Sequence, residues 1–377
     1  MASPKSYWKI ILILPLVTGC LEHYDPPVSN DKVGFLVVDG FINTTLQSAS
    51  VKLTDALGLS LSKSFPAVTQ AKVSIEEEGG NFISLSEKEN GNYEINYSFV
   101  NTKKYRLHIQ LPDGRNYQSE YIQPLTVPPL DSITWKGHAN GVTIYANAHD
   151  DTNQTRYYKW RYTETWSYNS FFYSYYKLEG GQAVFRTPEE SIYYCWGNEP
   201  STTILVNATT QLDKDIVHEF PLTIVPRGSR KLSRIYSILV EQRALDEKVY
   251  NYWIQLQKTT ESLGGLFDPL PSQVTGNIYN ENDASETVLG YFSGGNVQQK
   301  RIFIEFNDLP DNLRAFDSGG NCEKGSIKAD KLSELGSDKL LLQSFGANVI
   351  EGYITSSIDC VDCRTFGGTT TKPDFWP

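Results

Sequence analysis

The sequence predicts a mostly β protein: an immunoglobulin-like or prealbumin-like β-sandwich followed by a larger β-rich domain with one long packed helix. Three observations support this prediction. The chain contains 23 Tyr, 17 Phe and 7 Trp but a single Met, and aromatic residues favour strands. Short apolar runs separated by Gly, Pro and Asn recur along most of the chain. Only residues 244–263 show a sustained helical period.

The N-terminus has the features of a bacterial lipoprotein signal peptide. Two lysines precede a short apolar run, residues 10–17, which is too short to cross a bilayer. Residues 16–20 then read Leu-Val-Thr-Gly-Cys, the pattern of a lipobox. We therefore expect residues 1–19 to be removed and Cys20 to be lipidated. Each buried acyl CH₂ contributes ~0.8 kcal/mol, so two or more chains anchor a protein stably. An ordinary secretory signal is the alternative.

Two domains are predicted after this signal. Residues 20–32 contain Pro, Ser, Asn and Asp with little to bury, which is typical of a tether. Residues 33–127 contain seven short β runs at the spacing of a sandwich. The clearest run, residues 105–111, alternates apolar and polar side chains, so we expect one buried face and one solvated face. Prolines end this domain near residue 127.

The second domain, residues 128–377, is also strand-rich and unusually rich in aromatics. Tyr158, Trp160 and Tyr162 alternate with polar residues, which favours a place in the core. In residues 244–263 apolar residues recur on one helical face, with Lys, Asn and Gln opposite, and two glycines follow. This segment is therefore predicted to be a helix packed on a sheet.

Four cysteines remain besides Cys20, and an even number outside the cytoplasm favours two disulfides. Four cysteines allow three connectivities. We favour Cys322 with Cys360 and Cys195 with Cys363, which would tie the end of the chain to the domain body. The Cys-x-x-Cys spacing at the C-terminal end is the alternative signal for redox or zinc chemistry, but no second pair of this kind completes a metal site.

The net negative charge of the chain argues against binding to nucleic acids and to anionic lipids. Removal of residues 1–19 takes away two lysines and leaves 32 basic against 44 acidic residues, a formal charge of −12. Such a surface repels nucleic acids and anionic lipid heads. We therefore predict no nucleic-acid partner, and contact with the membrane through the lipid anchor alone.

No common catalytic motif is present in the sequence. H-E-x-x-H, G-x-S-x-G, the P-loop and G-x-G-x-x-G are all missing. Residues 149–153 and 280–283 are rich in oxygen ligands, but they lack the spacing of a calcium-binding EF-hand and read as solvated turns. We predict no catalytic residue, no cofactor and no metal site. A hydrolase with an unrecognised carboxylate pair stays open as an alternative.

The best candidate for a contact surface is a run of aromatics mixed with Ser and Asn. That mixture is typical of an exposed loop, and exposed aromatics favour contact with ligands or partners. Replacing two of its residues, Trp166 and Phe172, with Ala should then weaken binding without changing the melting temperature. The candidate residues are Trp166, Tyr168, Phe171, Phe172, Tyr173 and Tyr175.

A series of motifs in a fixed order resembles one known family. The motifs are the lipobox, Phe35-Leu36-Val37-Val38-Asp39-Gly40, Tyr105-Arg106-Leu107-His108-Ile109, Pro112-Asp113-Gly114, Pro128-Pro129-Leu130-Asp131-Ser132-Ile133, Gly276-Asn277-Ile278, Gly290-Tyr291-Phe292, and the Cys-x-x-Cys pair before Gly367-Gly368-Thr369. Together they resemble the Bacteroidota outer-membrane lipoproteins grouped as domain of unknown function 4249.

The resemblance implies a partner and a place in the cell. Members of the family are typically encoded beside TonB-dependent outer-membrane transporters. The expectation is therefore a lipid-anchored outer-membrane protein, facing the cell exterior, that acts as a non-enzymatic accessory or binding component of such an uptake system. Glu22 and Asp25 partly match the acidic signal for surface export in that phylum. A structural or adhesive envelope protein is the second hypothesis, and a hydrolase is the third.

Overall fold

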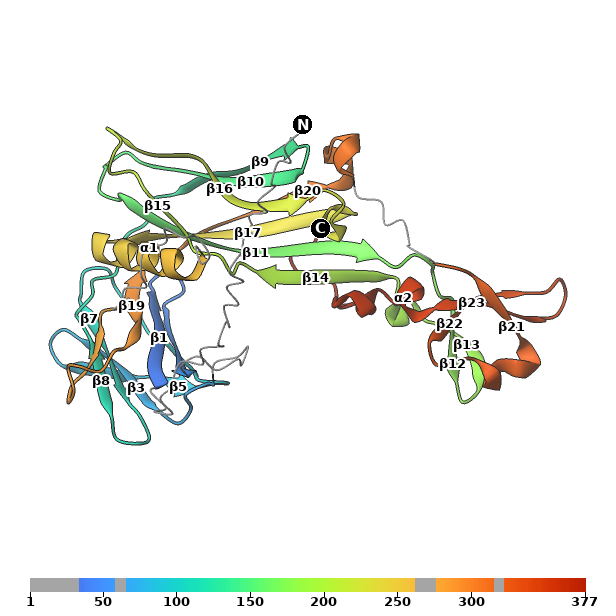
Figure 1. Cartoon of the computed structure of the whole chain (residues 1–377), viewed down its shortest axis with the longest axis horizontal. Helices are drawn as coiled ribbons and strands as arrows, with labels where there is room; N and C mark the ends of the chain where they lie inside the picture. Colours follow the sequence, from blue (N-terminus) through green and yellow to red (C-terminus); the bar gives the residue numbers. More distant parts are fainter. Residues whose placement is uncertain (1–33, 58–65, 262–275, 315–321) are drawn as a thin grey trace, which may run out of the picture.

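The structure is a computed structural model that describes residues 34–57, 66–261, 276–314 and 322–377. The predicted signal peptide, Cys20 and the tether lie outside these ranges. The described chain is mostly β with one long helix, which confirms the predicted fold class. Its strands form six sheets. Figure 1 shows them gathered into three units, with α1 (Glu247–Glu261) lying where the first unit meets the second.

The first unit is a sandwich of two five-stranded sheets. One sheet has the order β19-β1-β2-β6-β5 and the other β18-β8-β7-β3-β4. Tyr105, Leu107 and Ile109 point into the shared core, as their alternation predicts. The strands are β1 (Gly34–Asn43), β2 (Ser48–Leu57), β3 (Lys72–Glu77), β4 (Asn81–Ser84), β5 (Ser86–Glu87), β6 (Asn92–Asn96), β7 (Tyr105–Gln110), β8 (Asn116–Ser119), β18 (Ile278–Asn280) and β19 (Leu289–Gly295).

The expected boundary near residue 127 does not enclose this unit. β18 pairs with β8, and β19 pairs in parallel with β1 from Val37↔Leu289 to Asn43↔Gly295. Both strands come from the part of the chain assigned by sequence to the second domain. The sequence-based division is therefore wrong at this point, because pairing between strands so far apart leaves no local pattern in the sequence.

Close backbone contact explains two of the sequence motifs. A Cβ on Gly276 would lie 1.5 Å from the Gly290 carbonyl oxygen, and one on Gly290 would lie 1.8 Å from that of Val38. The Asn277 side chain donates to the Phe292 carbonyl and accepts from the Phe292 N–H, each at 2.8 Å. Asn277 thus pairs with β19 through its side chain, and these residues close the edge of the first unit.

The second unit packs a three-stranded sheet, of order β16-β10-β9, on a larger sheet of order β14-β11-β17-β20 with β15 also on β11. Tyr158, Trp160 and Tyr162 lie in the core between the two sheets, as predicted. The Trp160 indole donates to Gln242 and stacks 4.5 Å from Phe220. The strands are β9 (Leu130–His138), β10 (Gly141–Asp150), β11 (Tyr157–Asn169), β14 (Tyr194–Pro200), β15 (Leu205–Ala208), β16 (Asp215–Pro226), β17 (Ile235–Leu245) and β20 (Gln298–Glu305).

The helix α1 joins the first two units. Asp246 accepts a hydrogen bond from the Val249 N–H at 2.8 Å and so caps its N-terminus. On its apolar face, Tyr252 packs 5.3 Å from Tyr291 of β19. Tyr250 packs 4.9 Å from Tyr157 of β11. The predicted helix is confirmed from Glu247 to Glu261, but its predicted start is wrong, because Ala244 and Leu245 belong to β17. Its predicted end lies outside the described residues.

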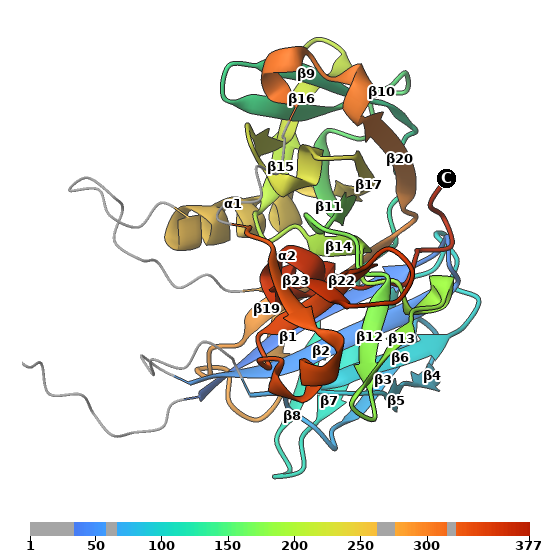
Figure 2. The same cartoon turned by 90° about the vertical axis from the view of Figure 1, so that its right-hand side faces the viewer.

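A third unit extends from the far ends of β11 and β14, as Figure 2 shows end-on. It has its own small core, which includes Tyr176, Leu341 and Tyr353. Sequence analysis assigned these residues to the second domain. Its elements are β12 (Tyr176–Glu179), β13 (Gln182–Phe185), β21 (Gly325–Lys328), β22 (Lys339–Phe345), β23 (Gly352–Ser357) and α2 (Ile358–Val361). The short 3₁₀ helices of the described chain are η1 (Pro188–Glu190), η2 (Arg230–Leu232), η3 (Phe306–Asp308), η4 (Asp311–Leu313), η5 (Ala329–Glu334) and η6 (Cys363–Phe366).

Two disulfides hold the third unit, and they have the favoured connectivity. Cys195 is bonded to Cys363 and Cys322 to Cys360. The first links β14 to η6 across 168 residues of sequence. The prediction of the pairing is therefore confirmed, and the C-terminal segment is covalently attached to the second unit.

Replacing Asn277 with Ala should lower the free energy of unfolding by about 2 to 4 kcal/mol, because the buried N–H and carbonyl of Phe292 would both lose their partner. Urea unfolding followed by tryptophan fluorescence measures the change. Asn282→Ala is the control, since Asn282 is exposed. Equal stability of the two variants would contradict this role of Asn277.

Candidate functional site

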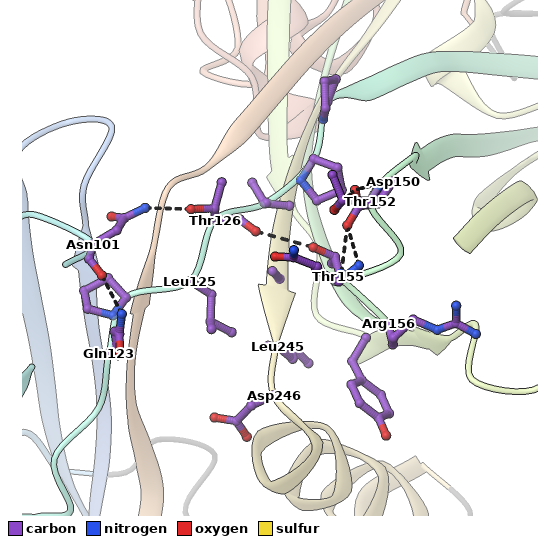
Figure 3. Close-up of a pocket in the computed structure, with 17 residues that line it drawn as sticks. Asn101, Gln123, Leu125, Thr126, Asp150, Thr152, Thr155, Arg156, Leu245 and Asp246 are labelled. Carbon is purple, nitrogen blue, oxygen red and sulfur yellow. Dashed lines mark hydrogen bonds between the residues drawn. The ribbon is translucent and has the colours of Figure 1, made fainter. Parts of the chain in front are cut away.

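A cleft lies where the chain crosses from the first unit to the second. Its volume is about 860 Å³. Figure 3 shows its three walls: the linker of residues 123–129, the turn of residues 150–157, and the end of β17 with the start of α1, residues 244–246. Ligand sites occur preferentially at such junctions between domains. Sequence reasoning identifies the proline-rich linker only as the end of a domain and misses its place in the wall of a cleft.

The linker wall is held from both sides by hydrogen bonds. Asn101 donates to the Thr126 hydroxyl at 3.0 Å, and the Gln123 amide donates to the Asn101 carbonyl at 2.9 Å. On the other side the Val127 N–H donates to Asn296 at 2.6 Å. Leu125 forms a bridge with Gly295 at the end of β19. Hydrogen bonds to the first unit therefore hold this linker in a defined conformation.

The second wall is a turn built around Asp150. Its carboxylate accepts hydrogen bonds from the Thr152 hydroxyl at 2.6 Å and from the backbone N–H groups of Thr152, Gln154 and Thr155. Burial alone would raise the pKa of Asp150, but these hydrogen bonds outweigh it and lower the pKa to about 2. Asp150 is therefore ionised at neutral pH and serves the turn, so it is not a proton donor for catalysis.

The third wall contains the other cleft carboxylate, Asp246, which caps α1. Nearby, the Arg156 guanidinium donates to the carbonyls of Thr209 and Leu212, each at 2.6 Å. The charged groups that line the cleft are thus engaged in local structure. The rest of the lining combines apolar and ring surface from the prolines, Leu125, Leu245 and Tyr157 with uncharged polar side chains, among them Gln123, Thr126 and Gln154. Such a surface suits binding better than acid–base chemistry.

The predicted aromatic loop is wrong for three of its six residues. Trp166 and Tyr168 belong to β11, and Tyr168 is 1% exposed with its hydroxyl donating to the Cys363 carbonyl. Trp166 is half-buried and packs on Gly197, where a Cβ would meet the indole at 2.3 Å. Phe172 is half-buried among Cys360 and its neighbours. Because Trp166 and Phe172 pack in cores, their replacement should destabilise the fold, contrary to the sequence-based expectation.

The other three candidates are exposed, and two of them join further tyrosines on the surface. Phe171, Tyr173 and Tyr175 are 43%, 38% and 48% exposed. Tyr173 lies 4.6 Å from Tyr175 and 5.1 Å from Tyr193, measured between ring centroids. Tyr193 in turn lies 4.7 Å from Tyr194. We name Tyr173, Tyr175, Tyr193 and Tyr194 the tyrosine patch; sequence reasoning found only its first half.

The described residues contain no group of three or more His, Cys, Asp and Glu side chains arranged to hold a metal ion. A search for membrane spans among the same residues finds no helix with the length and apolar character to cross a bilayer.

The fold and the cleft define the class of the protein: a mostly β protein with two sandwich units joined across a cleft and a smaller third unit. The family model for Domain of unknown function (DUF4249) matches residues 21–301. The match covers most of the chain, so the chain belongs to this family, as its motifs predict. The matched range includes β18 and β19 and ends in β20, so β21–β23 lie beyond it. No curated protein matches the sequence.

Asp150 should make the stability of the protein depend on pH. Its folded-state pKa of about 2 lies below the ordinary value of 3.8. The stabilisation is therefore complete above about pH 4 and is lost as the pH falls towards 2. Asp150→Asn should lower the free energy of unfolding by up to about 2 kcal/mol at pH 7 and by much less at pH 2.

Urea unfolding at pH 7, 4, 3 and 2 measures this difference. Asp151→Asn is the matched control, because the neighbouring Asp151 side chain is 93% exposed. A constant difference between wild type and Asp150→Asn across this pH range would contradict the assignment.

Proposed function

We propose that this protein is an outer-membrane lipoprotein, anchored through Cys20 and facing the cell exterior, that acts as a non-enzymatic binding component beside a TonB-dependent transporter. The cleft between the first two units would hold the ligand. The tyrosine patch, which lies beside β14 and the third unit, would contact the transporter. The lipobox and the family membership support the cellular setting.

The observation that carries the proposal is the cleft itself. Its walls come from two separate β units and are ordered by hydrogen bonds within the protein. A preordered pocket loses little conformational entropy when a ligand binds. The cleft carboxylates Asp150 and Asp246 both accept hydrogen bonds from nearby backbone N–H groups. This arrangement favours binding over the hydrolysis that a free carboxylate pair would permit.

The tyrosine patch suits contact with a protein. Tyrosine rings bury a large area at low entropic cost and are enriched at interface hot spots. The Arg234 guanidinium lies 4.8 Å from the Tyr194 ring and adds a second residue type that is common in hot spots. The patch lies beside β14 and the third unit, while the cleft lies at the other end of β11. A ligand and a transporter could therefore be bound at the same time.

The test is a pull-down of the tagged, lipidated protein from its native outer membrane in mild detergent, with mass spectrometry of the bound proteins. We expect a TonB-dependent transporter at near-stoichiometric yield. The double variant Tyr173→Ala, Tyr175→Ala should reduce the recovered transporter at least tenfold, because each exposed ring is removed from the interface. The double variant should keep the wild-type melting temperature, since the two side chains are exposed.

Phe82→Ala is the control, because Phe82 is a 57% exposed aromatic on the first unit. Recovery of the lipoprotein alone, under conditions that preserve known complexes, would contradict the proposal and favour a structural or adhesive role. Undiminished transporter recovery with the double variant would remove the patch from the interface while leaving the uptake role in place.

A further inference from the structure

A buried lysine lies under α1, separate from the cleft. Lys159 is only 9% exposed and belongs to the face of β11 opposite the core residues Tyr158 and Trp160. Its ammonium nitrogen lies 2.9 Å from the centroid of the Trp253 ring. Among the described residues, no oxygen lies within hydrogen-bonding distance of this nitrogen. A buried ammonium group normally has a charged or hydrogen-bonding partner.

A second, partly buried cation lies beside it. Arg243 of β17 is directly opposite Lys159 in the antiparallel pairing, so the two side chains share one face. The Arg243 guanidinium lies over the Phe41 ring of β1 at 3.8 Å, and its Nε is buried with no hydrogen-bond partner in the described structure. The Glu241 carboxylate is 3.8 Å from another nitrogen of the same group.

The surrounding charges do not neutralise this pair. Arg161, two residues along β11, is exposed on the same face. Burial, helped by the positive charges of Arg161 and Arg243, holds the pKa of Lys159 well below its ordinary value, and Asp39 of β1 opposes this only in part. Burial also lowers the pKa of Arg243. Three cations thus face two acids, Asp39 and Glu241, in a chain that is acidic overall.

We propose that Lys159, Arg161 and Arg243 form an oxyanion-binding site that takes the carboxylate or phosphate group of a small ligand. A guanidinium fork and an ammonium point charge are the groups that bind such oxyanions most strongly. The Trp253 ring lies beside Lys159 and the Phe41 ring beside Arg243, and both rings offer apolar surface to the rest of the ligand. The exposed Arg161 and Asp39 mark the side from which the ligand enters. The site is independent of the transporter.

The test is isothermal titration of the full mature lipidated chain in mild detergent with two probes, inorganic phosphate and benzoate. We expect saturable binding of at least one probe. Lys159→Met and Arg243→Met should each weaken it at least tenfold, and Arg161→Met should weaken it severalfold. Lys72→Met is the control, because Lys72 is exposed on β3 of the first unit.

Thermal unfolding without the probes separates a binding role from a structural one. Lys159→Met should melt no lower than the wild type, because an apolar side chain replaces a buried cation that has no hydrogen-bonding partner among the described residues. Preference for phosphate or for benzoate identifies the headgroup. The proposal is overturned if the wild type binds neither probe, or if Lys159→Met and Arg161→Met both bind as well as the wild type. Arg161→Met keeps the test valid if a buried variant fails to fold, because Arg161 is exposed.

Discussion

The parallel pairing of β1 with β19 constrains how the rest of the chain can fold. The two strands are separated by the whole of the second unit's first seven strands and by α1, so this intervening chain begins and ends at the first unit. The close approach of Gly276, Gly290 and Val38 leaves no room for side chains at the two glycines. The first two units are therefore not independent segments of the chain, because the later strands β18 and β19 complete the first unit. The helix α1 packs on β19 through Tyr252 and Tyr291.

The cleft follows from this arrangement. Because the chain passes between the units more than once, the linker of residues 123–129 runs beside β19 and forms a bridge with it at Gly295. Hydrogen bonds from Asn101 and Asn296 then order the linker from both sides. The same packing brings the end of β17 and the capped start of α1 to the opposite wall. A preordered cleft is thus a consequence of the topology, and its fixed walls favour recognition of a ligand over large movement between the units.

Local sequence patterns correctly predicted the features of the fold that depend on residues close together in the sequence. Alternation identified the buried faces at Tyr105 and Trp160, and helical spacing identified α1. The return of β18 and β19 could not be predicted, because strand pairing over such a distance has no periodic signal. The aromatic loop failed for a different reason. β11 continues through Asn169, and serines of the run are buried but paired: the Ser167 hydroxyl accepts from the Ile235 N–H, and the Ser170 hydroxyl donates to the Phe172 carbonyl. A polar residue that is buried with hydrogen-bonded partners cannot be told from an exposed one when only the polarity of the sequence is considered.

The buried carboxylates Glu76 and Asp215 each have hydrogen-bonding partners within the protein, and Lys159 differs from them in this respect. Glu76 is held by Arg106, His108 and Tyr121, and these partners outweigh burial to lower its pKa to about 2. Asp215 accepts hydrogen bonds from Tyr158 and Thr209. Lys159 is buried to a similar degree, but among the described residues its ammonium group has the Trp253 ring contact and no hydrogen-bonding partner. An unpaired buried cation lowers stability, and an apolar side chain of similar size would fit beside Trp253 without that cost. Stability therefore does not explain the lysine, whereas a negatively charged group arriving from outside the chain would supply the missing partner.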